Sequence, residues 1–273
     1  MLLDSATFYD PVACSAPVGA ATWRTPLSRI GAIARHNTML ILREPGPLAS
    51  RLIMPVVFIA LLHPLYLASQ GRAGGASQAV IATLITFSLL AMSIPGTSIL
   101  TERVWRTWTR LRMTAIRPAE LLAGKAVPVI AALLAQQALV IGFGVVVLGL
   151  DVAWPLLLAV ALLVWTLALI GMGAAIGVLA RSLSELSVIY DLGGILLSSL
   201  GGALVPLAAM PGWARHVAPA SPGYWAVSAL HAALGGDAAG TLRACAVLAG
   251  IAVACGALAA ARVGRGAARS ATL

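Results

Sequence analysis

The sequence has few charged residues and few aromatic ones. Only 10% of its 273 residues are charged and 5% are aromatic, whereas 60% are hydrophobic. A typical soluble domain carries charge on about a quarter of its residues. The shortage of charge therefore excludes an ordinary soluble domain, and a chain that is apolar to this degree is expected to fold in lipid.

Cysteine and lysine are scarce as well. Cys245 and Cys255 belong to one predicted helix, about 15 Å apart at 1.5 Å per residue, which is too far for a disulfide. The single lysine, Lys125, leaves arginine as the main basic residue, which is typical of GC-rich bacterial genomes. Residues 1–20 contain Asp4 and Asp10, no basic residue and no continuous apolar core, so no cleavable signal peptide is predicted.

Motifs for nucleotide hydrolysis and for metal binding are missing. The phosphate-binding pattern G-x-x-x-x-G-K-[ST] does not occur, because the only Gly-Lys pair, Gly124-Lys125, is followed by Ala126. The histidines show neither an H-E-x-x-H pattern nor the i, i+4 spacing of metal ligands on a helix. The chain is therefore predicted to be no enzyme and to bind no metal or cofactor. If ATP drives it, ATP and Mg are expected in a partner subunit.

Long apolar stretches dominate the rest of the sequence. A helix needs roughly 20 apolar residues to cross about 30 Å of hydrocarbon while it pairs all its backbone polar groups internally. Six stretches meet this requirement: 48–68, 78–100, 127–150, 154–180, 186–206 and 241–261. The predicted fold is an all-α membrane protein with six transmembrane helices.

The basic residues are distributed unevenly between the two sides of these spans. With the N-terminus inside, the outer side keeps only Arg72, Arg215 and Arg243, and nearly all other basic residues are cytoplasmic. Cytoplasmic loops of membrane proteins are enriched in Lys and Arg, so this imbalance predicts that both termini are cytoplasmic. The net charge of +9 then reflects topology and not nucleic-acid binding. The predicted location is the plasma (inner) membrane of a bacterial cell, crossed several times.

The segments outside the spans divide the chain further. Residues 1–25 are predicted to be a flexible cytoplasmic N-terminus and 262–273 a basic cytoplasmic tail, on either side of the six-helix domain at 48–261. Residues 26–47 mix apolar and basic side chains in a pattern that fits an amphipathic helix in the membrane interface, with an ordinary surface helix as the alternative. The residues expected to define this interfacial helix are Ile30, Ile33, Arg35 and Ile41.

Residues 207–240 are apolar, but prolines and glycines interrupt them. Interrupted backbone is tolerated at membrane depth only where protein or water covers it, so short re-entrant helices are predicted between spans five and six. The candidate residues of this segment are Pro211, Trp213 and Tyr224, and the aromatic ones would be interfacial anchors. The alternative is a seventh span, which would move the basic tail outside against the charge rule.

Four polar side chains inside the predicted spans are functional candidates: His63, Gln136, Gln137 and Asp191. An ionisable residue at membrane depth is a candidate by default, although a packed polar role is more common for a residue such as His63. For Asp191, a structural arginine partner is favoured over proton coupling, which usually needs several buried acids and bases. Gly173 and Gly177 form a G-x-x-x-G pattern, which predicts a close helix crossing, and a subunit interface is one place for it.

The connection 101–125 between the second and third spans has the highest density of charge in the chain. It reads TERVWRTWTRLRMTAIRPAELLAGK. Trp105, Trp108 and Leu111 recur at helical spacing, with Arg103 and Arg106 on the other face. Trp and Arg are enriched in protein-contact hot spots, so this exposed helix fits a docking patch. A positive loop that touches only lipid headgroups fits the composition equally well.

Two runs of residues carry a resemblance to a known family. The first is Glu102-Arg103, Thr107-Trp108, Leu111, Pro118, Glu120-Leu121-Leu122 and Lys125, and the second is Met210-Pro211-Gly212-Trp213 with Pro222 and Tyr224. In order and spacing they resemble the cytoplasmic loop, and the segment between helices five and six, of the ABC-2 type transporter permease family. Within that family the chain is most similar to daunorubicin-resistance-like exporters of drugs and lipids.

The resemblance implies a permease subunit of an ATP-binding cassette exporter that moves a hydrophobic or amphiphilic drug or lipid out of the cell. It implies two permease subunits, identical or homologous, bound to two ATPase subunits. The residues it assigns to coupling with the ATPase are Glu102, Arg103, Trp105, Arg106, Trp108, Leu111 and Arg112. One departure is His231, where relatives often have a basic residue. A permease for a lipid-linked polysaccharide and a stand-alone secondary carrier are the alternatives.

Overall fold

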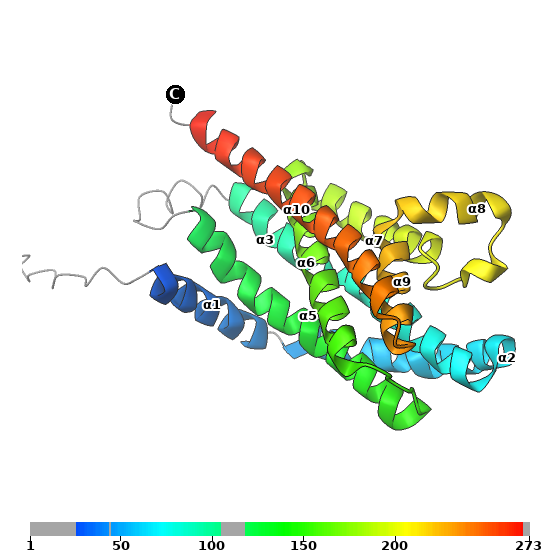
Figure 1. Ribbon diagram of the computed structural model, residues 1–273. Helices are drawn as coiled ribbons and strands as arrows, with labels where there is room; N and C mark the ends of the chain where they lie inside the picture. Colours follow the sequence, from blue (N-terminus) through cyan, green and yellow to red (C-terminus); the bar gives the residue numbers. More distant parts are fainter. Residues whose placement is uncertain (1–25, 44, 105–117, 270–273) are drawn as a thin grey trace, which may run out of the picture.

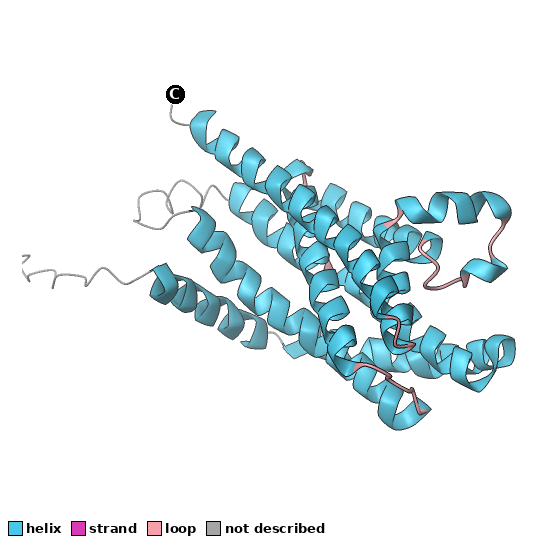
Figure 2. Cartoon of the chain, viewed as in Figure 1, coloured by secondary structure: helices cyan, strands magenta, loops and turns pink. Residues whose placement is uncertain are grey.

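The computed structural model describes residues 26–43, 45–104 and 118–269, which are mostly helical and contain no strand (Figures 1 and 2). The α-helices are α1 (Pro26–Arg43), α2 (Pro45–Ala91), α3 (Ser93–Val104), α5 (Pro118–Leu148), α6 (Pro155–Leu179), α7 (Leu183–Leu200), α8 (Gly212–Val217), α9 (Pro222–Leu234) and α10 (Ala238–Arg269). Two 3-10 helices, η1 (Leu207–Ala209) and η2 (Ala218–Ala220), flank α8. The flexible N-terminus predicted at 1–25 lies outside the described residues.

Six of the described helical segments are long and apolar enough to span a membrane. They are Ala49–Arg72, Gly74–Thr101, Ala123–Leu148, Pro155–Leu179, Leu183–Leu200 and Ala238–Arg262. Each overlaps one predicted span, and the bounds differ by a few residues. The prediction of an all-α fold with six membrane-spanning helices is confirmed. The spans are helical because every backbone polar group that lies in hydrocarbon must be paired within its own segment.

The first two spans are joined by a tight turn inside α2. The helix runs from Pro45 to Ala91 but departs from helical geometry at Gly71, where φ is 74° and ψ is −175°. Only glycine adopts this conformation without strain. Beyond the turn, Gly75 lets the two spans meet closely, since a Cβ there would lie 2.7 Å from the backbone of Leu67.

The second span is interrupted near its far end, where a continuous helix is predicted. α2 ends at Ala91, a turn follows at Met92, and α3 begins at Ser93. Pro95 explains the break, because proline has no N–H to donate and its ring clashes with the carbonyl group four residues earlier. The span is therefore built from two helical pieces.

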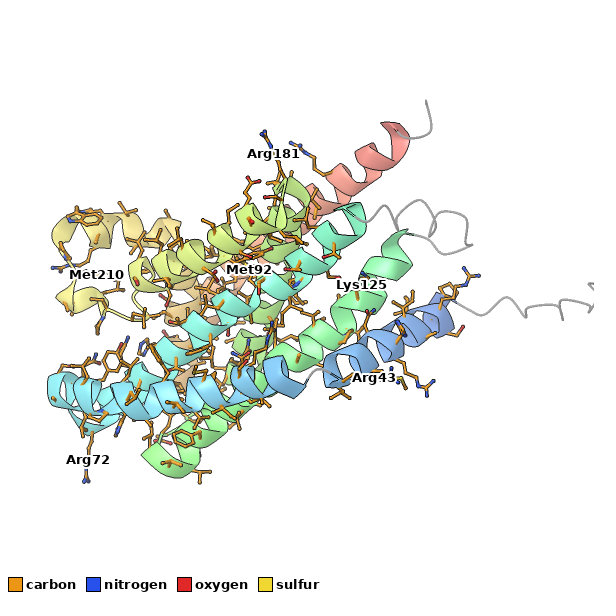
Figure 3. All side chains as sticks on the ribbon, turned by 180° about the vertical axis from the view of Figure 1, so that it is seen from behind. Arg43, Arg72, Met92, Lys125, Arg181 and Met210 are labelled. Atoms are coloured by element: carbon orange, nitrogen blue, oxygen red, sulfur yellow. The ribbon has the colours of Figure 1, made fainter. Side chains whose placement is uncertain are left out.

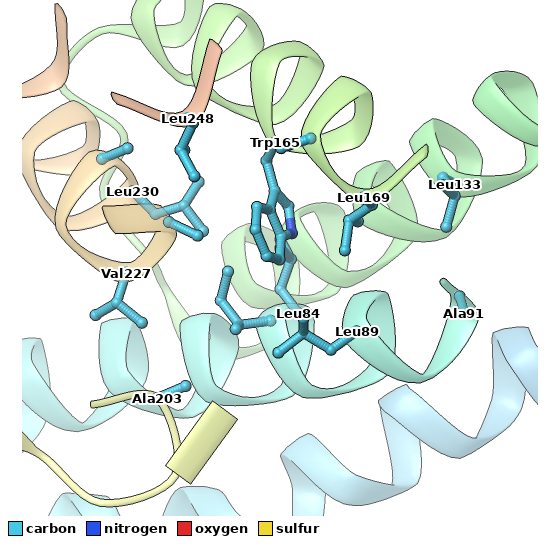
Figure 4. Close-up of a cluster of buried hydrophobic side chains, with 14 of the residues drawn as sticks. Leu84, Leu89, Ala91, Leu133, Trp165, Leu169, Ala203, Val227, Leu230 and Leu248 are labelled. Atoms are coloured by element: carbon cyan, nitrogen blue, oxygen red, sulfur yellow. The ribbon is translucent and has the colours of Figure 1, made fainter. Parts of the chain in front are cut away.

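The second span and α6 form the centre of the bundle. In their most apolar windows, 78% of the second span and 50% of α6 are buried inside the protein, against 17% of the first span. Trp165 of α6 lies in the middle of the core, between Leu84 of α2 and Leu248 of α10 (Figure 4). The outer spans therefore keep apolar faces that the described residues do not cover.

α3 and α6 cross at backbone contact distance. A Cβ atom on Gly177 would lie 2.6 Å from the carbonyl oxygen of Gly96, and one on Gly173 would lie 2.6 Å from that of Met92. Tyr190 of α7 closes the crossing, since its hydroxyl donates to the Gly173 carbonyl at 2.9 Å. The close crossing predicted from the G-x-x-x-G pattern thus lies within the chain and not at a subunit interface.

The substitution Gly177→Ala should destabilise this crossing. The added Cβ has no room against the backbone of Gly96, and overpacking of this kind costs about 1–3 kcal/mol. The thermal unfolding midpoint of the purified protein in detergent should fall by several degrees, because ~1 kcal/mol shifts it by roughly 2–4 °C in a chain of this size. Gly142→Ala on α5 is the matched control, since nothing lies within 4 Å of a Cβ there. Equal midpoints for the two variants would contradict the packing described here.

Candidate functional site

The charged connection between the second and third spans starts at the end of α3 and ends at the start of α5. Glu102 and Arg103 belong to the last turn of α3. The other residues predicted to contact an ATPase lie outside the described residues: Trp105, Arg106, Trp108, Leu111 and Arg112. Where the two helices enter the connection, Lys125 Nζ of α5 donates to Ser98 Oγ of α3 at 3.2 Å. The structure thus describes the helices on both sides of the connection, and the contact helix between them stays a prediction.

The start of α5 also packs against α1, which lies within the segment 26–47 predicted to be an interfacial helix. A Cβ on Gly124 would lie 2.7 Å from Ile33 Cβ and 3.1 Å from the carbonyl oxygen of Ile30, so the two helices touch through the glycine. Ile30 and Ile33 are half-buried and Arg35 is exposed, while the side chain of Ile41 is outside the described part. The apolar side predicted to face the membrane interface therefore packs in part against α5.

At the opposite end of the bundle, residues 201–206 leave α7 without forming a helix. Figure 3 shows Arg43 and Lys125 toward the end where α5 begins, and Arg72 and Met210 toward this opposite end. Backbone carbonyl groups that no helix pairs must find other donors when they are buried. This non-helical segment is therefore the second candidate site, where side chains must donate hydrogen bonds to backbone carbonyl groups.

Gln78 of α2 supplies two of the missing donors. Its Nε2 donates to the carbonyl oxygens of Gly202, at 3.1 Å, and of Ala203, at 2.6 Å, and the side chain is only 3% exposed. The Tyr66 hydroxyl similarly donates to the Leu204 carbonyl at 2.6 Å. Both tie residues 202–204 to the first two spans.

His231 of α9 completes the arrangement around Gln78. Its Nε2 lies 3.3 Å from Gln78 Oε1. Because the Gln78 amide nitrogen donates to two carbonyl groups, its oxygen is the acceptor, and the histidine carries a proton on Nε2. His231 therefore has a positioning role here that needs no permanent positive charge.

The segment predicted to be re-entrant, 207–240, consists of short helices between turns. α9 packs into the core through Val227 and Leu230, whereas Trp213 on α8 is 69% exposed. Pro211 precedes α8 as its N-cap residue, and Tyr224 packs edge-on against Trp225 with ring centroids 5.3 Å apart. With 13 residues, α9 is too short to cross the roughly 30 Å of hydrocarbon, which argues against a seventh span.

The polar candidates inside the spans do not form one cluster. Gln137 of α5 donates to Thr166 Oγ1 of α6 at 3.1 Å, and both side chains are buried, as is Gln136. His63 is half-buried on α2, and Asp191 is exposed on α7. Among the arginines whose side chains the structure describes, none forms an ion pair with the exposed Asp191, so its arginine partner stays a prediction.

The family model for the ABC-2 type transporter matches residues 28–234, well over half of the chain. The chain belongs to the ABC-2 type transporter family. No curated protein matches it significantly. In ABC-2 type transporters the matched region is the transmembrane component and not the ATPase, so the chain is a multi-pass membrane protein of the permease class.

The match to the ABC-2 type transporter family covers both places described above. It runs from α1 to the end of α9 and so contains the connection between α3 and α5 as well as the non-helical segment 201–206. Gln78 and Tyr66 are candidates that apolar runs do not reveal. The sequence indicates a role for Gln78 only by placing a polar amide at the first position of the predicted span 78–100. Its two acceptors are more than 100 positions away, so no local pattern reveals the hydrogen bonds.

The substitution Gln78→Leu should loosen the segment 201–206. It keeps the volume but leaves the carbonyl groups of Gly202 and Ala203 without their donor, and each buried orphan group costs about 1–3 kcal/mol. Amide hydrogen exchange of Gly202 and Ala203 should accelerate about tenfold or more, since ~1.4 kcal/mol is a factor of ten. Gln70→Leu, at an exposed position of the same helix, should leave the exchange unchanged. Unchanged exchange in Gln78→Leu would refute the anchoring role.

Proposed function

We propose that this chain is the permease subunit of an ATP-driven exporter that moves a hydrophobic or amphiphilic substrate, a drug or a lipid, out of a bacterial cell. A separate ATPase subunit supplies the energy. The observation that carries the proposal is the match to the ABC-2 type transporter over 28–234, in a chain without a phosphate-binding loop. Six apolar spans with few ionisable residues support a pathway for an apolar substrate over one for ions.

The contact with the ATPase is assigned to the connection between α3 and α5, on the cytoplasmic side. Lys125, Arg181 and Arg262 are near the ends of spans that meet at this end of the bundle, as the charge rule requires of the cytoplasmic side. The Trp and Arg side chains between residues 105 and 112 would provide the docking surface, since these residue types dominate contact hot spots. ATP and Mg would be bound by the partner alone.

Movement of the connection would reach the bundle through two close contacts. On one side, α3 meets α6 at Gly96 and Gly177, and on the other side, α5 meets α1 at Gly124. Contacts as close as these transmit displacement because packed helices leave little compressible space between them. A displaced docking helix would therefore shift α6 and α1 together, a rigid-body change of the kind that switches between two states.

A second permease subunit, identical or homologous, would cover apolar faces that the chain leaves open. Only 17% of the first span and 22% of α7 are buried in their most apolar windows. These faces contact lipid, a second subunit or the substrate. Two six-helix bundles would enclose a pathway between them, because Trp165 and its neighbours fill the centre of the bundle that the structure describes.

The double substitution Arg106→Glu and Trp108→Ala should disconnect the permease from its ATPase. It reverses one charge and removes one aromatic anchor on the proposed docking surface, and each hot-spot residue contributes about 2 kcal/mol or more. Recovery of the ATPase with the tagged permease from native membranes should fall at least tenfold, and ATP-dependent efflux of an amphiphilic dye should stop.

The matched control is Arg72→Glu with Trp213→Ala, which changes the same residue types at exposed positions of the opposite end. This control should keep both the partner and the efflux. Normal recovery and efflux in the Arg106→Glu and Trp108→Ala variant would overturn the assignment. A native permease that recovers no ATPase at all would favour a carrier that acts alone.

A further inference from the structure

A cavity of about 280 Å³ lies between four helices at the end of the bundle where α5 begins. It is lined by α3, α5, α6 and α10, through residues such as Ser98, Val129, Ala174 and Ala259. These residues come from the last turns of the second, fourth and sixth spans and the first turns of the third. The cavity therefore lies at one membrane depth, in the half of the bundle assigned above to the cytoplasmic leaflet.

The wall of the cavity is apolar with one charged corner. Alanine, glycine, valine, isoleucine and proline make up the lining apart from Ser98 and Lys125. Lys125 Nζ donates to Ser98 Oγ at 3.2 Å and has further interactions. The pair places a cation and a hydroxyl group side by side at the rim of the cavity, and both groups are donors that suit an oxyanion. The side chains of Ala123 and Ala260 are exposed, so the cavity opens to the surface of the bundle.

The size and the chemistry of the cavity restrict what it can hold. Its volume is just below the roughly 300–1,000 Å³ range of small-molecule sites, enough for one alkyl tail or ring system and too small for a whole lipid. An apolar wall binds hydrocarbon and offers no hydrogen bonds to sugars or peptides. A cation on the rim favours an anionic headgroup, and such charge-assisted bonds are about twice as strong as neutral ones.

We infer that this cavity binds an anionic amphiphile, with its hydrocarbon tail between α3, α5, α6 and α10 and its carboxylate or phosphate on Lys125 and Ser98. The inference deepens the proposed function by naming the class of cargo. Export of the bound amphiphile rests on the proposed function, whereas binding in the cavity does not. An anionic lipid of the membrane shares this chemistry with an exported anionic amphiphile. The two sources are separated by competition.

The test uses the full chain in phosphatidylcholine nanodiscs and a fatty acid that carries a diazirine on its tail. Photolysis should attach the probe to peptides of α3, α5, α6 and α10 that contain lining residues. Lys125→Gln should reduce this labelling about tenfold, the effect of losing ~1.4 kcal/mol, whereas Lys125→Arg should keep it. Replacing the acid by the corresponding alcohol should have the same effect as Lys125→Gln.

Gly256 provides a second variant that does not alter the charge. It lines the cavity and nothing lies within 4 Å of a Cβ there, so Gly256→Leu should fill the space and reduce labelling at least as strongly. Gly250→Leu is its control on the same helix, because that position is equally open but is outside the cavity lining. Gly250→Leu should label normally.

Phosphatidylglycerol added to the nanodiscs identifies the source of the headgroup. If it suppresses labelling, the natural occupant is a membrane lipid, and if labelling persists, the site selects the single-chain amphiphile. Equal labelling in all variants, or equal labelling by the alcohol, would overturn the inference. The test involves no ATPase, so its failure would leave the docking proposal intact, and loss of the docking proposal would leave this binding result unaffected.

Discussion

The structure depends on one constraint, that no backbone polar group in hydrocarbon can be left unpaired. Helices meet it over six spans. Where the chain leaves helical geometry at 202–204, Gln78 and Tyr66 supply the missing donors. Because these donors belong to the first two spans, hydrogen bonds tie the non-helical segment to both of them.

Close contacts between helices are the second factor that determines how the bundle packs. Hydrocarbon gives little hydrophobic drive for helices to associate, so packing through small residues takes its place. Gly96, Gly173 and Gly177 bring α3 against α6, and Gly124 brings α5 against α1. The two ends of the charged connection thus join different parts of the bundle through close contacts at glycines. Other small residues, such as Gly171, Ala174 and Gly256, line the cavity beside Lys125.

The apolar runs predicted the six spans well, because length and hydropathy alone decide whether a helix can cross a bilayer. They did not predict the break at Met92, although Pro95 is its cause and is visible in the sequence. The roles of Gln78 and of the contact between Gly124 and Ile33 depend on residues far away in the chain, which no local pattern encodes. For the docking surface, the sequence remains the source, since Trp105 to Arg112 lie outside the described residues.

The proposed contact with an ATPase requires the charged connection to lie on the cytoplasmic side of the membrane. Its side can be measured in a chain whose Cys14, Cys245 and Cys255 are replaced by alanine, with a single cysteine introduced by Thr107→Cys or by Arg72→Cys, and with a maleimide that does not cross membranes. With the connection inside the cell, Arg72→Cys should be labelled in intact cells, and Thr107→Cys should be labelled only after the membrane is permeabilised. Labelling of Thr107→Cys in intact cells would put the connection outside, out of reach of any ATPase, and would contradict the account.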